Sequence, residues 1–204
     1  MATRRKMPTY DLKLPRGRSH EAALFLAELD DQTRRMLEDL KGITAAELAW
    51  QPKRGQNTIG MLLTHLAVVE VYWLMVAAGR FTPAALKRSG ARSVAEQEYR
   101  RVLGVGPDDD GMPLAKNGLP PRVLEGWTYA DYRRLLGRAR VHVAAQVLEL
   151  TDRDLARKVK RVRMNGEQMA QSVRWILYHV LEHFSGHYGQ ILLLRHQYAD
   201  RKKK

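Results

Sequence analysis

The chain of 204 residues contains no cysteine. This absence excludes disulfides, thiolate zinc sites, iron–sulfur clusters and a cysteine nucleophile, so any metal must be held by nitrogen and oxygen ligands. The basic start, residues 1–6, is followed by Pro8 and Asp11 rather than by an apolar stretch, so a secretory signal is lacking as well. We therefore expect a cytoplasmic protein.

Acidic residues are few, 22 against 35 lysines and arginines, and the net charge is +13. Much of the excess lies at the ends: residues 1–18 carry six basic residues against one acidic, and residues 195–204 carry five against one. We predict basic tails at 1–18 and 199–204 around a single domain at 19–198. Flexible basic ends attract polyanions weakly and without specificity. No zinc finger, helix-turn-helix or RNA-binding aromatic motif is found, so nucleic acid is expected only as a nonspecific partner of the tails.

Long runs with helical periodicity account for most of the chain, and no βαβ unit or internal repeat is present. Capping signals support two of the starts, Ser19 for the first and Thr128 with Asp131 for the third. The stretch 157–163 has the pattern of an extended connector, and Asn165-Gly166 that of a turn. We predict an all-α fold, an up-down four-helix bundle with a long crossover loop between helices 2 and 3, its helices near 20–40, 57–78, 128–150 and 168–198.

The second of these segments is apolar nearly all round. Between residues 61 and 78 its only clearly polar side chains are Thr64, His65 and Glu70. A histidine and a glutamate would be costly in lipid, and a core helix has the same pattern, so no membrane span is predicted. The additional apolar face also fits a homodimer interface.

Three of the seven histidines, His179, His183 and His187, follow one another at intervals of four residues. On a helix, residues four apart lie on one face and can reach one metal ion. His183 and His187 share an apolar stripe, and His65 shares the apolar face of the second helix, so all three should point inward. Two histidines from one helix and one from another would form a three-nitrogen site with open coordination positions. Alternatively, each is a core histidine bonded to a carbonyl or a tyrosine, which is the better reading for any one alone.

The other ionisable candidates rank lower. His179 fits packing or a hydrogen bond to a ligand better than direct coordination. Glu70 lies about 140° round the helix from His65. This position favours an electrostatic role at a helix end, a contact with a partner chain, or a hydrogen bond to a metal ligand rather than coordination. His142 has no spaced partner, and His20 and His196 are expected at the surface. Hydrogen bonds to substrate are conceivable from three tyrosines, Tyr72, Tyr178 and Tyr188.

Two segments, 48–70 beginning Leu48-Ala-Trp50-Gln-Pro52 and 183–191 beginning His183-Phe-Ser-Gly-His187, resemble the DinB/YfiT-like superfamily of four-helix-bundle metalloproteins. The resemblance implies His65, His183 and His187 as ligands of a divalent ion, zinc or nickel first and manganese or iron as alternatives, in a protein that is often dimeric. Some relatives transfer low-molecular-weight thiols such as bacillithiol or mycothiol, or isomerise maleylpyruvate with a thiol cofactor. Tyr188 departs from the arginine of many relatives, which leaves substrate contacts open. The loop at 81–126 and both tails are not explained by the resemblance.

We therefore expect a metal-dependent enzyme acting on a small molecule, of the thiol S-transferase or hydrolase type, with no catalytic side chain assigned. A bound cation would generate the attacking thiolate or hydroxide without a cysteine. The alternatives are a noncatalytic stress-response bundle and a polyanion- or nucleic-acid-binding protein that acts through its tails.

Overall fold

The computed structural model describes residues 10–82, 84, 91–112, 117–162 and 167–201. The predicted turn at Asn165 and Gly166 and the outer parts of both tails lie outside these residues. The described chain is mostly helical, with α1 (His20–Asp39), α2 (Ala45–Leu48), α3 (Ile59–Ala77), α5 (Ala91–Val102), a 3-10 turn η1 (Arg122–Leu124), α6 (Tyr129–Val147), α7 (Asp152–Ala156), β1 (Lys158–Val162), β2 (Gln168–Ser172) and α8 (Val173–Asp200).

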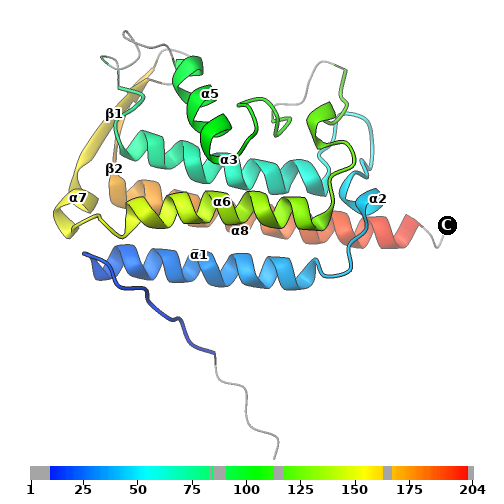
Figure 1. Ribbon diagram of the computed structural model, residues 1–204, viewed down its shortest axis with the longest axis horizontal. Coiled ribbons are helices and arrows are strands. Elements are labelled where there is room, and N and C mark those ends of the chain that lie inside the picture. Colours follow the sequence, from blue (N-terminus) through cyan, green and yellow to red (C-terminus); the bar gives the residue numbers. More distant parts are fainter. Residues whose placement is uncertain (1–9, 83, 85–90, 113–116, 163–166, 202–204) are drawn as a thin grey trace, which may run out of the picture.

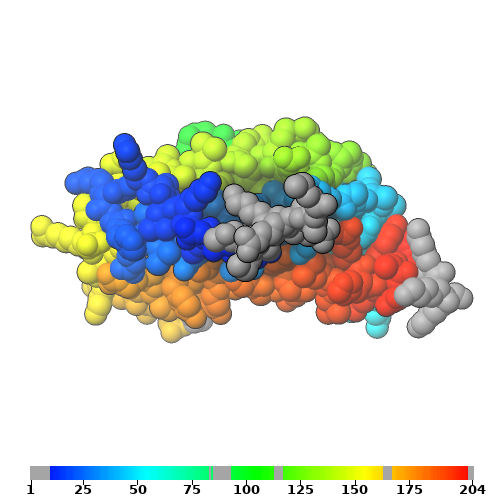
Figure 2. Space-filling model, turned by 90° about the horizontal axis from the view of Figure 1, so that it is seen from below, coloured from blue at the N-terminus to red at the C-terminus, as the bar shows by residue number. Residues whose placement is uncertain are grey.

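Four long helices, α1, α3, α6 and α8, lie side by side (Figure 1). Helix α3 packs against α6 and α8, and α1 completes the group by packing against the same two helices. The view from below shows α1 between α6 on one side and α8 on the other (Figure 2). The caps that the sequence predicts are present: the Ser19 side chain accepts from Ala22 N, and Thr128 and Asp131 form a capping box.

The helix directions depart from strict up-down alternation. Gly60 at the start of α3 approaches Tyr132 at the start of α6, so these two helices run in the same direction. Helix α8 runs against α3, because His65 meets His183 while Trp73 meets Trp175. The chain between α3 and α6 runs back along α3, which is why α6 begins at the end where α3 begins (Figure 1).

Helix α3 supplies much of the core. It begins after Thr58, whose side chain accepts from Met61 N, and it is long and apolar enough to cross a membrane, yet 89% of its apolar window is buried inside the protein. Such burial is typical of the core helix of a soluble protein.

The predicted fold class holds in that the described chain is mostly helical, but the prediction of a helix from about Gln168 is wrong, and the fold is not helical throughout. Residues Lys158–Val162 and Gln168–Ser172 form a two-stranded antiparallel sheet, and α8 begins only at Val173, after the cap Ser172. Residues 158–162 alternate charged and apolar side chains in part, and their pairing with residues 168–172 makes the second segment a strand, with Val159 and Gln171 on the buried side.

Glu70 does not take any of the three roles that its spacing favours. Its carboxylate, 1% exposed, accepts two hydrogen bonds from Arg140 on α6, at 3.0 Å and 3.2 Å, and Arg140 also contacts Asp30 and Thr33 of α1. Burial raises the pKa of Glu70, against the opposing effect of Arg140. This buried pair ties α1, α3 and α6 together.

Candidate metal centre

Three histidine side chains converge between α3 and α8. His183 Nε2 lies 3.2 Å from His65 Nε2 and 3.1 Å from His187 Nε2, and all three ligand nitrogens lie within 4.8 Å of one another. Two imidazole nitrogens on one tetrahedral zinc ion, each at about 2.0–2.1 Å, would lie roughly 3.3 Å apart. The observed spacing therefore suits a shared cation.

The packing of α8 on α3 sets this convergence. Trp73 of α3 contacts Trp175 and His179 of α8 edge-on, with ring centroids 5.9 Å and 4.7 Å apart, and so fixes how the two helices slide past each other. Two turns of helix from this contact, His65 on α3 and His183 on α8 face each other. The spacing of four residues along α8 then places His187 beside His183.

The far side of two of the rings is held by oxygen acceptors. His65 Nδ1 lies 2.8 Å from Asp110 Oδ2, and His187 Nδ1 lies 2.8 Å from Gln190 Oε1. A carboxylate and a carbonyl oxygen only accept, so both Nδ1 atoms carry the proton and both Nε2 atoms offer a lone pair to the centre. This carboxylate–histidine arrangement is typical of metal-ligating histidines.

Asp110 lies on the chain between α5 and η1. The neighbouring Gly111 has φ +69°, and a Cβ there would lie 2.9 Å from Met61 Cε and 2.8 Å from Pro121, so only glycine allows the loop this close to α3. Asp110 is 3% exposed, and its Oδ1 accepts from Met112 N at 3.0 Å. Sequence reasoning missed this residue; the run of three aspartates at 108–110 is the signal that could have suggested it.

His183 differs from the other two histidines. Its Nδ1 is buried and has no hydrogen-bond partner in the part of the chain that the structure describes. Burial, followed by the charges of His187 and His65, lowers the pKa of His183 to about 3, and burial also lowers the pKa of His187. Both rings are thus neutral at physiological pH, the state in which imidazole binds a metal.

The donor set fits a divalent cation. In the metal-free protein, His183 Nε2 can donate one proton, either to His65 Nε2 or to His187 Nε2. The lone pair on the other of these two nitrogens is then left without a donor. A single cation satisfies three lone pairs at once. The structure thus brings together the three histidines that the sequence singles out, and their role as metal ligands stays a prediction.

The remaining candidates lie elsewhere. His179 stacks on Trp175, with ring centroids 4.9 Å apart, and its ring centroid is 6.0 Å from that of His183, so it packs as expected. His20 and His196 are exposed, as predicted. Tyr188 bonds Asp39 of α1 rather than reaching the histidines.

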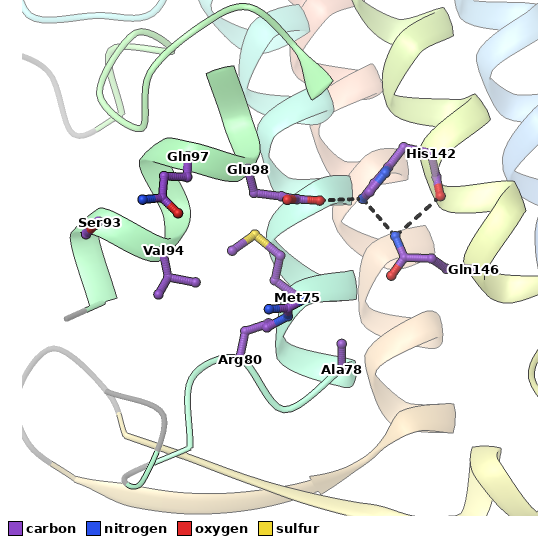
Figure 3. A pocket seen from close by; sticks show the side chains of 9 residues that line it. All are labelled: Met75, Ala78, Arg80, Ser93, Val94, Gln97, Glu98, His142 and Gln146. Carbon is purple, nitrogen blue, oxygen red and sulfur yellow. Dashed lines mark hydrogen bonds and ion pairs between the residues drawn. The ribbon is translucent and has the colours of Figure 1, made fainter. Parts of the chain in front are cut away.

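A separate polar pocket of about 420 Å³ lies beside α3, α5 and α6 (Figure 3). In it, His142 Nε2 lies 3.3 Å from Glu98 Oε1 and 2.7 Å from Gln146 Nε2. Burial lowers the pKa of His142, against the opposing effect of Glu98. The described lining of this pocket includes none of the three converging histidines.

Comparison with known proteins finds a family match over most of the chain. The sequence model of the DinB superfamily matches residues 14–191. Among solved structures, the chain is similar to the crystal structure of a DinB-like protein from Bacillus cereus ATCC 10987, with 18% sequence identity, coverage of 86% of this chain and 91% of that chain, and a TM-score of 0.49. No curated protein matches. The family match includes α3 and the part of α8 that carries His183 and His187.

Proposed function

This chain belongs to the DinB superfamily, and on that premise we propose that it binds one divalent metal ion through His65, His183 and His187. The observation that carries the proposal is the meeting of three Nε2 atoms within 4.8 Å, two of them on rings whose Nδ1 atoms donate to Asp110 and Gln190. The three histidine ligands come from α3 and α8. We assign these helices to a four-helix bundle with a crossover between its second and third helices.

Three neutral imidazoles favour zinc or nickel, and accept manganese or iron. Three protein ligands leave coordination positions open, as in catalytic rather than structural sites. A bound ion supplies Lewis acidity, which lowers the pKa of a thiol or a water molecule in an open position. We therefore propose a metal-dependent enzyme of the thiol S-transferase or hydrolase type, acting on a small molecule, with a low-molecular-weight thiol as the co-substrate in the first case.

The chain's own residues have defined parts in this chemistry. Asp110 holds the proton on His65 Nδ1, and Gln190 does the same for His187, so that both rings keep their orientation and their lone pairs face the centre. His183 is neutral and is held by its ring contacts with His65 and His187, at centroid distances of 5.0 Å and 4.3 Å. No cysteine competes for the ion or for the substrate.

Two further features belong to the same proposal. We propose a cytoplasmic location, where low-molecular-weight thiols stay reduced. We also propose a homodimer, because α8 leaves large apolar side chains exposed, among them Tyr178 at 58% and Leu193 at 56%.

Elemental analysis of the untagged protein tests metal binding. We expect about one divalent ion per chain in the wild type and its loss in His65→Ala and His183→Ala, with the helical circular dichroism retained. His196→Ala is the matched control, because it truncates an exposed histidine on the same helix and leaves the three nitrogens and the Trp73 contacts in place. A wild type that contains no metal and takes none up on reloading, or ligand variants that keep the ion, would overturn the assignment. A protein that binds the ion would then be screened for thiol transfer and hydrolysis.

A further inference from the structure

The inner face of the two-stranded sheet carries two polar side chains with unused hydrogen-bonding groups. The register pairs Val159 with Gln171 and Arg161 with Met169, and paired residues in an antiparallel sheet point to the same side. Val159 and Gln171 are buried, so this side faces the protein. Arg161 and Gln171 are diagonal neighbours across the strands, within reach of each other's long side chains.

Arg161 is a partly buried cation without a counter-ion in the described part of the chain. Its Nη1 donates to the Tyr72 hydroxyl at 2.8 Å, and its guanidinium carbon lies 4.6 Å from the centre of a Trp73 ring. None of the ion pairs found between described residues involves Arg161, and its buried Nε has no acceptor among these residues. A guanidinium presents five donors in a planar fork that matches a carboxylate, so the unused donors favour an anionic ligand.

Gln171 supplies the second observation. Its side chain is 7% exposed, and neither Nε2 nor Oε1 has a hydrogen-bond partner among residues 10–82, 84, 91–112, 117–162 and 167–201. Buried polar groups in folded proteins are almost always paired, and an unpaired one requires a cause such as a bound water molecule or ligand. A glutamine amide N–H beside an arginine is a suitable donor for the second oxygen of a carboxylate.

Contacts along α3 relate Arg161 to the metal centre. Tyr72, which Arg161 contacts, follows His65 by seven residues on α3 and therefore lies on the same face, about 10 Å along the helix. Arg161 also contacts Trp73, whose ring centroid lies 4.7 Å from that of His179. The ring centroid of His179 lies in turn 6.0 Å from that of His183. The α3 residue Tyr72, which Arg161 contacts, thus lies two helical turns from His65, and ring contacts extend from Arg161 through Trp73 and His179 to His183.

The charge of this region has the sign that an anionic substrate requires. Three neutral imidazoles leave the charge of a divalent ion uncompensated except by Asp110, and Arg161 adds a further positive charge. We propose that Arg161 and Gln171 bind the carboxylate of a small-molecule substrate whose reacting end lies at the three histidines. The position of the reacting end rests on the proposed function, whereas the carboxylate site does not.

The carboxylate site is tested first on the metal-free protein. Isothermal titration with butyrate, and with butyramide as the uncharged control, should show binding of butyrate alone that weakens with added salt. Arg161→Met should abolish this binding. Lys160→Met should leave it unchanged, because Lys160 carries the same charge one residue away on the exposed face of β1. Gln171→Leu should weaken butyrate binding and raise the melting temperature, since it removes an unpaired buried amide.

The distance to the metal centre is tested on the zinc-loaded protein. In a series of mercaptocarboxylates with lengthening spacers, affinity should rise roughly tenfold or more at the member whose length matches the separation between the three histidines and Arg161. The rise should be absent in the matching mercaptoamides and in Arg161→Met. Butyrate binding that depends on Arg161 in a protein that takes up no metal would keep the carboxylate site and overturn the proposed function. Metal uptake combined with butyrate binding that is absent, or that Arg161→Met does not change, would keep the metal site and overturn the carboxylate site.

Discussion

The hydrogen bond between His65 and Asp110 gives the sharpest prediction for the metal centre. Asp110→Asn preserves the size of the side chain but replaces one acceptor oxygen by an NH₂ group. In the wild type, Oδ2 faces His65 Nδ1 at 2.8 Å and Oδ1 faces Met112 N at 3.0 Å, and both partners donate. An asparagine can satisfy only one of them, whichever way its amide is turned.

Both orientations weaken the site. If the NH₂ group faces His65, the imidazole must accept at Nδ1, so its proton moves to Nε2 and blocks the nitrogen that faces the centre. If the NH₂ group faces Met112 N instead, two donors meet in a site that is 3% exposed, and the loop must shift. Loss of the hydrogen bond between a metal-ligating histidine and its carboxylate partner lowers metal affinity about 10- to 100-fold, equivalent to about 1.4–2.7 kcal/mol. We therefore expect the zinc dissociation constant to rise within that range.

Competition titration against a chromogenic chelator measures this constant. Asp109→Asn is the matched control, because it removes the same charge from the adjacent residue, whose carboxylate accepts from Gly106 N and does not touch the histidines. Wild-type affinity in Asp110→Asn would refute the reasoning. An equal loss in both variants would show that the net charge of the loop, rather than the orientation of His65, controls affinity.

Three further predictions concern stability. Arg140→Met should lower the free energy of unfolding by about 3–5 kcal/mol in urea, because it leaves the buried Glu70 carboxylate without its partner, while the double variant with Glu70→Leu should recover most of the loss. Stability of the metal-free protein should fall as the pH drops from 6.5 towards 3, since His183 stays neutral when folded but takes up a proton when unfolded; the contribution of His183 is about 2 kcal/mol at pH 5, and His183→Gln should lose less stability by that amount, while His187 and His142, whose pKa values are also lowered, still contribute. Gly111→Ala should destabilise the protein more than Gly126→Ala by about 1–3 kcal/mol, because both glycines have positive φ but only Gly111 lies against neighbouring side chains.

The sequence predicted those parts of the structure that depend on local patterns. Helix α1 begins after Ser19 because a serine side chain can accept from the first free N–H groups, and the Thr128–Asp131 capping box follows the same rule. The spacing of His183 and His187 fixes their common face on any helix. Their meeting with His65 required a tertiary assumption, namely that two apolar faces pack together, and the hydrophobic pattern of α3 and α8 was strong enough to support it.

The parts that the sequence did not predict depend on longer-range pairing. Residues 168–172 alternate polar and apolar side chains weakly, and they become a strand only because residues 158–162 pair with them. The helical periodicity that follows Val173 extended the predicted helix by five residues too many. Arg161 and Gln171 were likewise missed, since their importance lies in the partners they lack, and burial without a partner is a property of the folded structure alone.

The direction of α6 joins the topology of the fold to the chemistry of the site. Because α3 and α6 run in the same direction, the intervening chain has to travel back along α3, past the face that carries His65. On this path, Gly111 lets the backbone lie against Met61, one turn before His65, and so places the Asp110 carboxylate on His65 Nδ1. The segment that the family resemblance leaves unexplained therefore contains the residue that orients one of the three histidines. The run of aspartates at 108–110 could mark this segment as a candidate from sequence, but which carboxylate reaches His65 follows only from the path that the direction of α6 imposes.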